Sequence, residues 1–160
     1  MKIRNIKISD IKKIYETQIK SYPDILHEDV KVLREKIIKG KNYSFIAIDD
    51  GEVIGYLIAY KNYRYNEPKF NTTQQREGSK ENLNTLFIHD ICVVSEHRKK
   101  GLGRTLLESS IKEAKKYGLR YINAISVNNS INFAKKMGLI ETEIKVESYP
   151  PPAYFMEMIV

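Results

Sequence analysis

The chain has 160 residues, of which 42% are hydrophobic and 29% charged, and its net charge is +7. These proportions are typical of a folded soluble protein and exclude a disordered or fibrous one. No apolar run approaches the roughly 20 residues that a membrane span needs, and no apolar signal core follows Met1, so we expect no membrane partner.

The first half of the chain predicts one strand and two helices before a hairpin. Residues 2–8 alternate apolar and polar side chains, as a strand does, and Ser9 is placed to cap the helix that follows. A second helix is predicted from about residue 28 to residue 39, with Gly40 as its end. The side chains expected to face inward from this second helix are Val30, Leu33 and Ile37.

Two strands, 43–48 and 53–60, are joined by Asp49-Asp50-Gly51-Glu52. An Asp-Gly pair tolerates positive φ, so this segment is a strong hairpin signal. The polar segment 61–84 follows. A connection of this length is unusual inside a compact domain, and we favour disorder over a lid because its composition can bury little.

The second half alternates strands and helices. The predicted strands are 85–94, 119–127, 139–146 and 154–160, and the predicted helices run from Arg104 to Tyr117 and from Asn128 to Met137. Gly118 and Gly138 follow the two helices, where a glycine commonly provides the left-handed cap. No linker divides the chain, so we expect a single domain over residues 1–160.

A basic turn, Arg98-Lys99-Lys100-Gly101-Leu102-Gly103, lies between the strand 85–94 and the next helix. Glycines let the backbone approach phosphate oxygens, and the first N–H groups of a helix have no partner within it, so this turn suits a diphosphate. Two rival motifs do not fit. A Walker loop needs Lys where the chain has Arg104, and a dinucleotide fingerprint needs Gly where it has Leu106.

The remaining pattern, Arg-x-x-Gly-x-Gly shortly after Val93, resembles the acyl-coenzyme A (CoA) binding turn of the GCN5-related N-acetyltransferase (GNAT) family. The order of predicted elements agrees with this resemblance along the whole chain. It implies an α/β (α+β) fold with a mixed, mostly antiparallel sheet of about seven strands, splayed between the fourth and fifth strands and flanked by about four helices. The implied order is β-α-α-β-β-β-α-β-α-β-β, with the loop 61–84 between the third and fourth strands.

The resemblance implies acetyl-CoA as cosubstrate and no metal. The fourth strand of the family binds the pantetheine arm through its backbone, and the segment 128–139 resembles the one that flanks the far side of the cofactor. The cofactor-binding residues implied are Ile91, Val93, Arg98, Lys99, Lys100, Gly101, Leu102, Gly103, Arg104, Thr105, Asn128, Asn129 and Phe133.

His89 is the candidate general base, because it lies on the strand that should pass the thioester and an imidazole commonly titrates near neutral pH. The alternative is a hydrogen-bonded structural histidine. Strand alternation places Asp90 on the opposite face unless a bulge intervenes. Many family members carry a tyrosine that protonates the leaving thiolate where this chain has Ala134, so Tyr154, Tyr149 or water would have to supply that proton.

The acceptor is encoded only weakly. In the family fold the segment between the first two helices borders the acceptor side, and here it offers Tyr22, Asp24, Glu28 and Asp29. An aromatic ring and carboxylates could hold a cationic amine. Acids at the start of a helix are as commonly caps that complement its dipole.

We therefore predict an acetyl-CoA-dependent N-acetyltransferase that acts on a primary amine, of a small molecule or a peptide, by direct attack in a ternary complex. The alternative is a noncatalytic CoA-binding module or a basic module for RNA or protein. Lysines such as Lys112 and Lys116 are spread over expected helix faces, so we do not expect nucleic acid as the partner. The single cysteine, Cys92, is expected to be a small buried hydrophobe. The lack of a second cysteine favours a cytoplasmic location. The sequence does not decide between a monomer and a homodimer.

Overall fold

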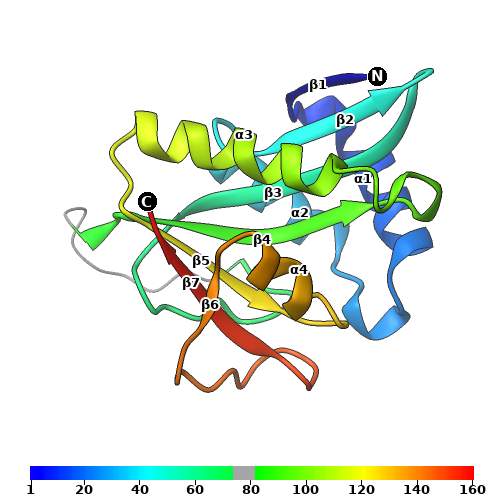
Figure 1. Cartoon of the computed structure of the whole chain (residues 1–160). Coiled ribbons are helices and arrows are strands. Elements are labelled where there is room, and N and C mark those ends of the chain that lie inside the picture. Colours follow the sequence, from blue (N-terminus) through cyan, green and yellow to red (C-terminus); the bar gives the residue numbers. More distant parts are fainter. Residues whose placement is uncertain (74–81) are drawn as a thin grey trace.

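The computed structural model describes residues 1–73 and 82–160. Within them, seven strands form one mixed sheet in the order β1-β2-β3-β4-β5-β7-β6 (Figure 1). The strands are β1 (Lys2–Asn5), β2 (Phe45–Asp49), β3 (Glu52–Asn62), β4 (Thr85–Val93), β5 (Tyr121–Ser126), β6 (Ile140–Glu141) and β7 (Tyr154–Ile159). The α-helices are α1 (Ile11–Ser21), α2 (Val30–Lys39), α3 (Leu102–Lys116) and α4 (Ile131–Lys136), and short 3-10 turns are η1 (Ile8–Asp10), η2 (Asp24–Leu26) and η4 (Ser95–His97).

The sheet comes apart between β4 and β5. These two strands form the one parallel pair in the described sheet, and they pair only from Thr85–Ile88 to Tyr121–Ala124. Beyond that point β4 continues to Val93 beside β3, whereas β5 continues to Ser126 beside β7. The predicted fold class and the splay between the fourth and fifth strands are confirmed.

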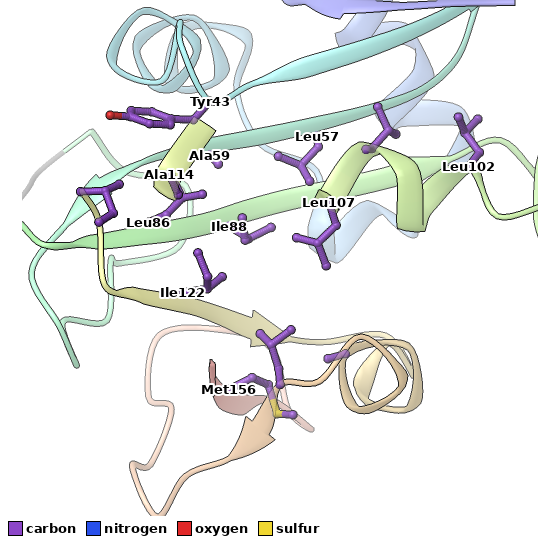
Figure 2. Packing of buried hydrophobic residues seen from close by; sticks show 14 of the residues in the cluster. Tyr43, Leu57, Ala59, Leu86, Ile88, Leu102, Leu107, Ala114, Ile122 and Met156 are labelled. Carbon is purple, nitrogen blue, oxygen red and sulfur yellow. The ribbon is translucent and has the colours of Figure 1, made fainter. Parts of the chain in front are cut away.

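Each face of the sheet has its own core. On one face, α3 packs over β2, β3 and β4, and the buried cluster there includes the residues labelled in Figure 2, such as Leu57, Leu86, Leu107 and Ile122. On the other face, α1 and α2 pack on β3 around a second cluster that includes Ile14 and Leu33. Figure 1 shows α3 in front of the sheet and α1 and α2 behind it. Side chains that alternate along one strand therefore belong to different cores.

Several predicted turns are confirmed by backbone angles. Asp50 and Gly51 have φ of 46° and 79° in the β2–β3 hairpin, as the Asp-Gly pair indicated. Gly118 and Gly138, with φ of 72° and 93°, follow α3 and α4 in the left-handed region. These features depend on neighbours in sequence alone, which is why the sequence indicates them.

The predicted cap of the first helix is wrong. Ser9 lies inside η1, and Asp10 occupies the N-cap position of α1. The Asp10 carboxylate accepts the Lys7 backbone N–H at 2.7 Å and binds the Arg4 guanidinium at 2.7 and 2.8 Å. This carboxylate joins β1 to the residues before η1, and it makes no side-chain hydrogen bond to the first N–H groups of α1.

Two further expectations about packing need correction. Val30 does not face inward: it is 48% exposed, and the buried stripe of α2 begins at Val32 and continues through Leu33 and Ile37. The strand predicted at 139–146 is limited to Ile140–Glu141. The Thr142 hydroxyl accepts the Ile144 backbone N–H at 3.2 Å, a local bond that replaces the strand ladder.

The predicted disorder of the loop 61–84 is wrong for its first part. β3 itself extends to Asn62, and residues 63–73, which we call the strap, are bound at three places. The Arg64 guanidinium pairs with Glu157 of β7 at 2.6 Å, Glu67 accepts the Ser148 backbone N–H at 2.8 Å, and Asn71 accepts the Asp29 backbone N–H at 2.8 Å. Residues 74–81 of the loop lie outside the described residues.

None of the helices in residues 1–73 and 82–160 is both long enough and apolar enough to cross a membrane. The longest, α3, has 15 residues and carries an exposed charged face.

Gly40 provides a test of how closely the end of α2 approaches β3. A Cβ at Gly40 would lie 1.8 Å from the Ala59 carbonyl oxygen, which is backbone and cannot rotate away. We expect Gly40→Ala to lower the free energy of unfolding by at least about 3 kcal/mol in urea denaturation. Gly51→Ala meets no atom within 4 Å and bears only the strain of its positive φ, so it should cost about 1 kcal/mol. Equal costs for the two variants would contradict this close approach.

Candidate functional site

Two unusual turns lie at the open end of the splay. β4 and β5 run parallel, so their last residues emerge at the same end of the sheet, where they no longer pair with each other. The turn after β4 has left-handed backbone at Lys99 and Gly101, with φ of 60° and 81°. The turn after β5 has left-handed backbone at Asn128 and Asn129, with φ of 49° and 64°. The splay is thus flanked by two turns built from residues that tolerate this conformation, glycine and asparagine among them.

The turn after β4 presents backbone N–H groups and cations together. Gly101 is the N-cap of α3, and the Thr105 N–H donates to the Gly101 carbonyl in the first bond of the helix. The N–H groups of the preceding residues of the first turn have no acceptor within α3. Arg98 is anchored by a 2.8 Å bond from its Nε to the Val93 carbonyl. Exposed positive side chains surround these groups: Arg98, Lys99, Lys100 and Arg104. This arrangement suits an anion with several phosphates.

Leu102, Gly103 and Phe133 take structural places in this region. The Leu102 side chain is buried in the core, so only its backbone is available to a ligand. A Cβ at Gly103 would lie 3.3 Å from the ring of Phe133 on α4. The glycine therefore allows α3 and α4 to approach each other beside the splay.

A β-bulge in β4 changes which face its side chains occupy. Ile58 of β3 pairs with Asp90, and the next residue, Ala59, pairs with Ile88, so His89 is an extra residue without a partner on β3. His89 contacts Glu28, and Asp90 contacts Tyr22, both on the face covered by α1 and α2. Strand alternation alone predicts opposite faces for His89 and Asp90, and the bulge reverses that prediction.

Under the bulge lies a buried cluster of Glu28, Lys36 and His89. Lys36 Nζ lies 2.8 Å from Glu28 Oε2 and 3.1 Å from His89 Nε2, and His89 Nε2 also contacts Glu28 Oε1. The side chain of His89 is 2% exposed, and Lys36 is 3% exposed. The ring of Tyr60 lies 6.1 Å from the His89 ring. A titratable cluster of this kind is held away from bulk water.

The charges in this cluster support one another. Burial by itself would raise the pKa of Glu28, but the charges and hydrogen bonds of His89 and Lys36 outweigh it and lower that pKa to about 2. Burial lowers the pKa of Lys36, and the attraction of Glu28 opposes that change. Glu28 is therefore an ionised acid at neutral pH, and it orients both nitrogen groups.

The remaining predicted acceptor residues are not brought together. The Tyr22 hydroxyl lies 2.7 Å from Asp90 Oδ1 and is not free to bind an amine. Asp24 lies on η2 with its side chain fully exposed, 3.8 Å from His27. Asp29 is the N-cap of α2. Of the segment between α1 and α2, only Glu28 reaches the buried cluster.

The two tyrosines proposed as proton donors lie on different sides of the sheet. Tyr154 packs against the core under α3, the same core that contains Ala134. The ring of Tyr149 lies 5.4 Å from the ring of Phe70 of the strap, tilted by 59° to it. Burial raises the pKa of Tyr149 well above its ordinary value, and the charges of Tyr60 and Glu28 add to this. Its hydroxyl has no hydrogen-bond partner among the described residues.

Sequence reasoning missed two residues of this region. They are Lys36 and Tyr56, whose hydroxyl lies 2.7 Å from Asp90 Oδ2. The expectation that lysines cover solvated helix faces holds for Lys112 and Lys116 but fails at Lys36. The burial of Lys36 could have been inferred from its position beside Ile37, on the apolar stripe of α2. Cys92 is buried as expected, and burial raises the pKa of its thiol to about 11.

The sequence matches the acetyltransferase (GNAT) family over residues 11–139. The chain belongs to this family. It is similar to an N-alpha-acetyltransferase of Sulfurisphaera tokodaii, with 26% identity over 147 residues that cover 89% of this chain and 82% of the relative.

Solved structures share the fold of this GNAT protein. Ard1 from Thermoplasma volcanium matches with a TM-score of 0.75 and 17% identity, over 99% of this chain and 97% of that one. Arabidopsis thaliana Naa50, in complex with the bisubstrate analogue CoA-Ac-MVNAL, matches with a TM-score of 0.74 and 15% identity, over 98% and 97% of the two chains. At these identities the likeness shows the fold, including the splayed sheet.

Ala134 lies on α4 and is 7% exposed within the core. Among residues 1–73 and 82–160, no three or more His, Cys, Asp or Glu side chains are grouped to hold a metal ion.

The charge of Glu28 should show in the acid stability of the protein. Its folded-state pKa of about 2 lies below the ordinary value of 4.5, so its ionisation stabilises the fold above pH 4.5, and this contribution is lost as the pH falls from 4.5 toward 2. We expect the difference in free energy of unfolding between the wild type and Glu28→Gln to be largest at neutral pH and to shrink across that window. Urea denaturation at several pH values measures it. A difference that stays constant with pH would show that Glu28 is not an ion pair partner in the folded state.

Proposed function

We propose that the protein transfers the acetyl group of acetyl-CoA to the α-amino group at the start of a peptide, by direct attack in a ternary complex. The observation that carries this proposal is the splay after Ile88 with the Lys99–Gly101 turn at its open end. An opening between strands takes an extended thioester arm, and a left-handed turn before a helix takes its diphosphate. The peptide acceptor is supported by the similarity to an N-alpha-acetyltransferase and to Naa50 with its peptide analogue.

The cofactor would be held mainly by backbone. Residues 98–105 would bind the diphosphate through free N–H groups and the cations Arg98, Lys99, Lys100 and Arg104. Ile91 and Val93 lie on the part of β4 that lacks β5 as a neighbour, so their backbone groups would orient the pantetheine and the thioester carbonyl. Asn128, Asn129 and Phe133 would flank the other side.

His89 would accept the proton of the attacking amine through a water molecule. Its side chain is nearly fully buried, so a relay suits it better than direct contact. The ionised Glu28 beside it would stabilise the imidazolium that forms. The amine could then attack as a neutral nucleophile while the pair holds the proton.

Tyr154 would protonate the leaving thiolate. It is half-buried on the side of the sheet that carries α4, where many relatives have their tyrosine and this chain has Ala134. Tyr149 lies instead beside the strap, on the side of Glu28. The lack of the usual tyrosine is the observation that favours the second candidate function, a CoA-binding module without catalysis.

The acceptor would enter on the face covered by α1 and α2, between Glu28 and the strap. Asn71 joins the strap to the start of α2, and Glu67 joins it to the loop before β7. Because these segments would border the acceptor on this side, they would favour an extended peptide terminus over a bulkier amine. The cytoplasmic location and the extent of the domain over residues 1–160 also remain predictions.

Ligand-induced stabilisation tests the cofactor site. Acetyl-CoA at 100 times its Kd should raise the free energy of unfolding by about 2.7 kcal/mol, seen as an increase in Tm. Gly101→Val places a branched side chain at φ of 81° and should abolish this increase. Gly51→Val bears the same kind of strain at φ of 79° in the remote hairpin and should keep it, so it is the matched control.

The same variants test catalysis. With acetyl-CoA and a peptide that has a free amino terminus, the wild type and Gly51→Val should release thiol, and Gly101→Val should not. A peptide with a blocked terminus and an internal lysine should react much more slowly. Binding of acetyl-CoA without thiol release on any amine would support the noncatalytic alternative, and stabilisation by RNA but not by acetyl-CoA would contradict both.

Tyr149 tests the acceptor side. Its buried hydroxyl lacks a partner among residues 1–73 and 82–160, so Tyr149→Phe should raise the free energy of unfolding by about 1 kcal/mol. If the hydroxyl binds the peptide, the same variant should raise the KM for the peptide by about fivefold and leave the KM for acetyl-CoA unchanged. A loss confined to kcat would instead indicate that Tyr149 donates the proton. Tyr65→Phe, which changes another strap-side hydroxyl bound to Glu157, is the control.

A further inference from the structure

The carboxyl group of Asp90 is held only by neutral groups. Its Oδ2 lies 2.7 Å from the Tyr56 hydroxyl, and its Oδ1 lies 2.7 Å from the Tyr22 hydroxyl. Among the described residues no lysine or arginine forms an ion pair with it. A buried carboxylate without a cation in contact is a costly arrangement.

The protons of this network can be counted. The Tyr22 hydroxyl lies 2.7 Å from Asp90 Oδ1 and 2.8 Å from the Ile91 carbonyl oxygen, yet it carries one proton. If Asp90 were ionised, both neighbours would be acceptors competing for that single proton. If Asp90 is protonated on Oδ1, it donates to Tyr22, Tyr22 donates to Ile91, and Tyr56 donates to Asp90 Oδ2. Only the protonated form gives every close contact its own hydrogen.

The charges around Asp90 lead to the same assignment. The groups that face it are Tyr22 from the end of α1, Tyr56 from β3, His89 and Cys92 from its own strand, Glu28 and Lys36 from the side of α2, and Tyr149 from the loop before β7. Lys36 is already paired with Glu28, so an ionised Asp90 would leave a negative charge that only a protonated His89 could balance. Burial raises the pKa of Asp90 above its ordinary value.

We propose that Asp90 is a protonated carboxylic acid in the folded protein at neutral pH and acts as a positioning residue for β4. Its proton directs the Tyr22 hydroxyl onto the Ile91 carbonyl, in the stretch of β4 that has no β5 neighbour. Because the protonated Asp90 carries no charge, it adds no negative charge beside the adjacent His89. This positioning role rests on the proposed function, whereas the protonation state of Asp90 does not.

Infrared difference spectroscopy tests the protonation state without any activity measurement. The spectrum of the wild type minus that of Asp90→Asn in heavy water at neutral pD should contain the C=O band of a protonated carboxyl group. If the difference spectrum instead contains the symmetric and antisymmetric stretching bands of an ionised carboxylate, the proposal is overturned. If Asp90→Asn does not fold, carbon NMR of wild-type protein labelled at aspartate Cγ gives the same answer, because one aspartate should keep the shift of the protonated acid.

Stability provides a second readout with a definite sign. For an acid with a raised folded-state pKa, the folded state holds the proton more tightly, so the wild type should lose free energy of unfolding relative to Asp90→Asn as the pH rises from 3.8 through that pKa. A relative gain over the same range would mean that Asp90 is ionised in the folded state.

The kinetic readout separates positioning from folding. Asp90→Asn keeps a donor and an acceptor, so the shape of its pH–rate profile should match that of the wild type. A shift of the acidic limb to lower pH would show that a negative charge had been removed from beside His89 and would contradict the proposal. Tyr22→Phe should raise the KM for acetyl-CoA by about fivefold with kcat little changed. Failure of the wild type to bind acetyl-CoA would reject the proposed function and leave the infrared result standing by itself.

Discussion

The extra residue at His89 is the feature on which the site depends. One residue later than the last pair between β4 and β5, the bulge turns two consecutive polar side chains onto the face covered by α1 and α2. Without it, Asp90 would enter the core beneath α3, which is apolar in its described part. The same residue thus marks where the sheet opens and determines that the titratable groups lie together on one side of the opening. A bulge is a common way to redirect side chains beside a functional site.

Burying the titratable groups Glu28, Lys36 and His89 lowers the stability of the fold. The attraction between their opposite charges offsets part of that cost. The ionised Glu28 and Lys36 lie together with His89 in a buried cluster, and removing one partner of a buried ion pair commonly costs about 3–5 kcal/mol. The protonated Asp90 would add no further charge. A buried group of this kind contributes little net stability compared with an apolar core.

The sequence indicates the features that depend on adjacent residues and misses those that depend on distant ones. The hairpin at Asp50 and Gly51 and the turn at Lys99–Gly101 are local, and the resemblance carried by that turn implied the splayed sheet. Lys36 and His89 are 53 residues apart, so no spacing rule could pair them. The prediction for the strap is wrong for the same reason. Its polar composition suggested disorder, but Arg64 is bound by Glu157 of β7, 93 residues later, and Glu67 by Ser148, 81 residues later. Ser9 does not cap α1, because it lies inside the 3-10 turn that precedes the helix.

The two sides of the splay differ in whether backbone or side chains would contact the ligand. A substitution can therefore change one side without changing the other. In the proposed site the cofactor side would consist mainly of backbone groups, which are fixed by the left-handed turn and by the end of the β4–β5 pairing. The acceptor side would consist of Glu28 and of side chains from α2, the strap and the loop before β7, joined by Asn71 and Glu67. Changes in the strap would alter the acceptor without disturbing the thioester. Ala134 is 7% exposed within the core under α3. In the proposed mechanism Tyr154 would supply the proton for the thiolate, because it pairs with Ser126, the last residue of β5, at the open end of the splay.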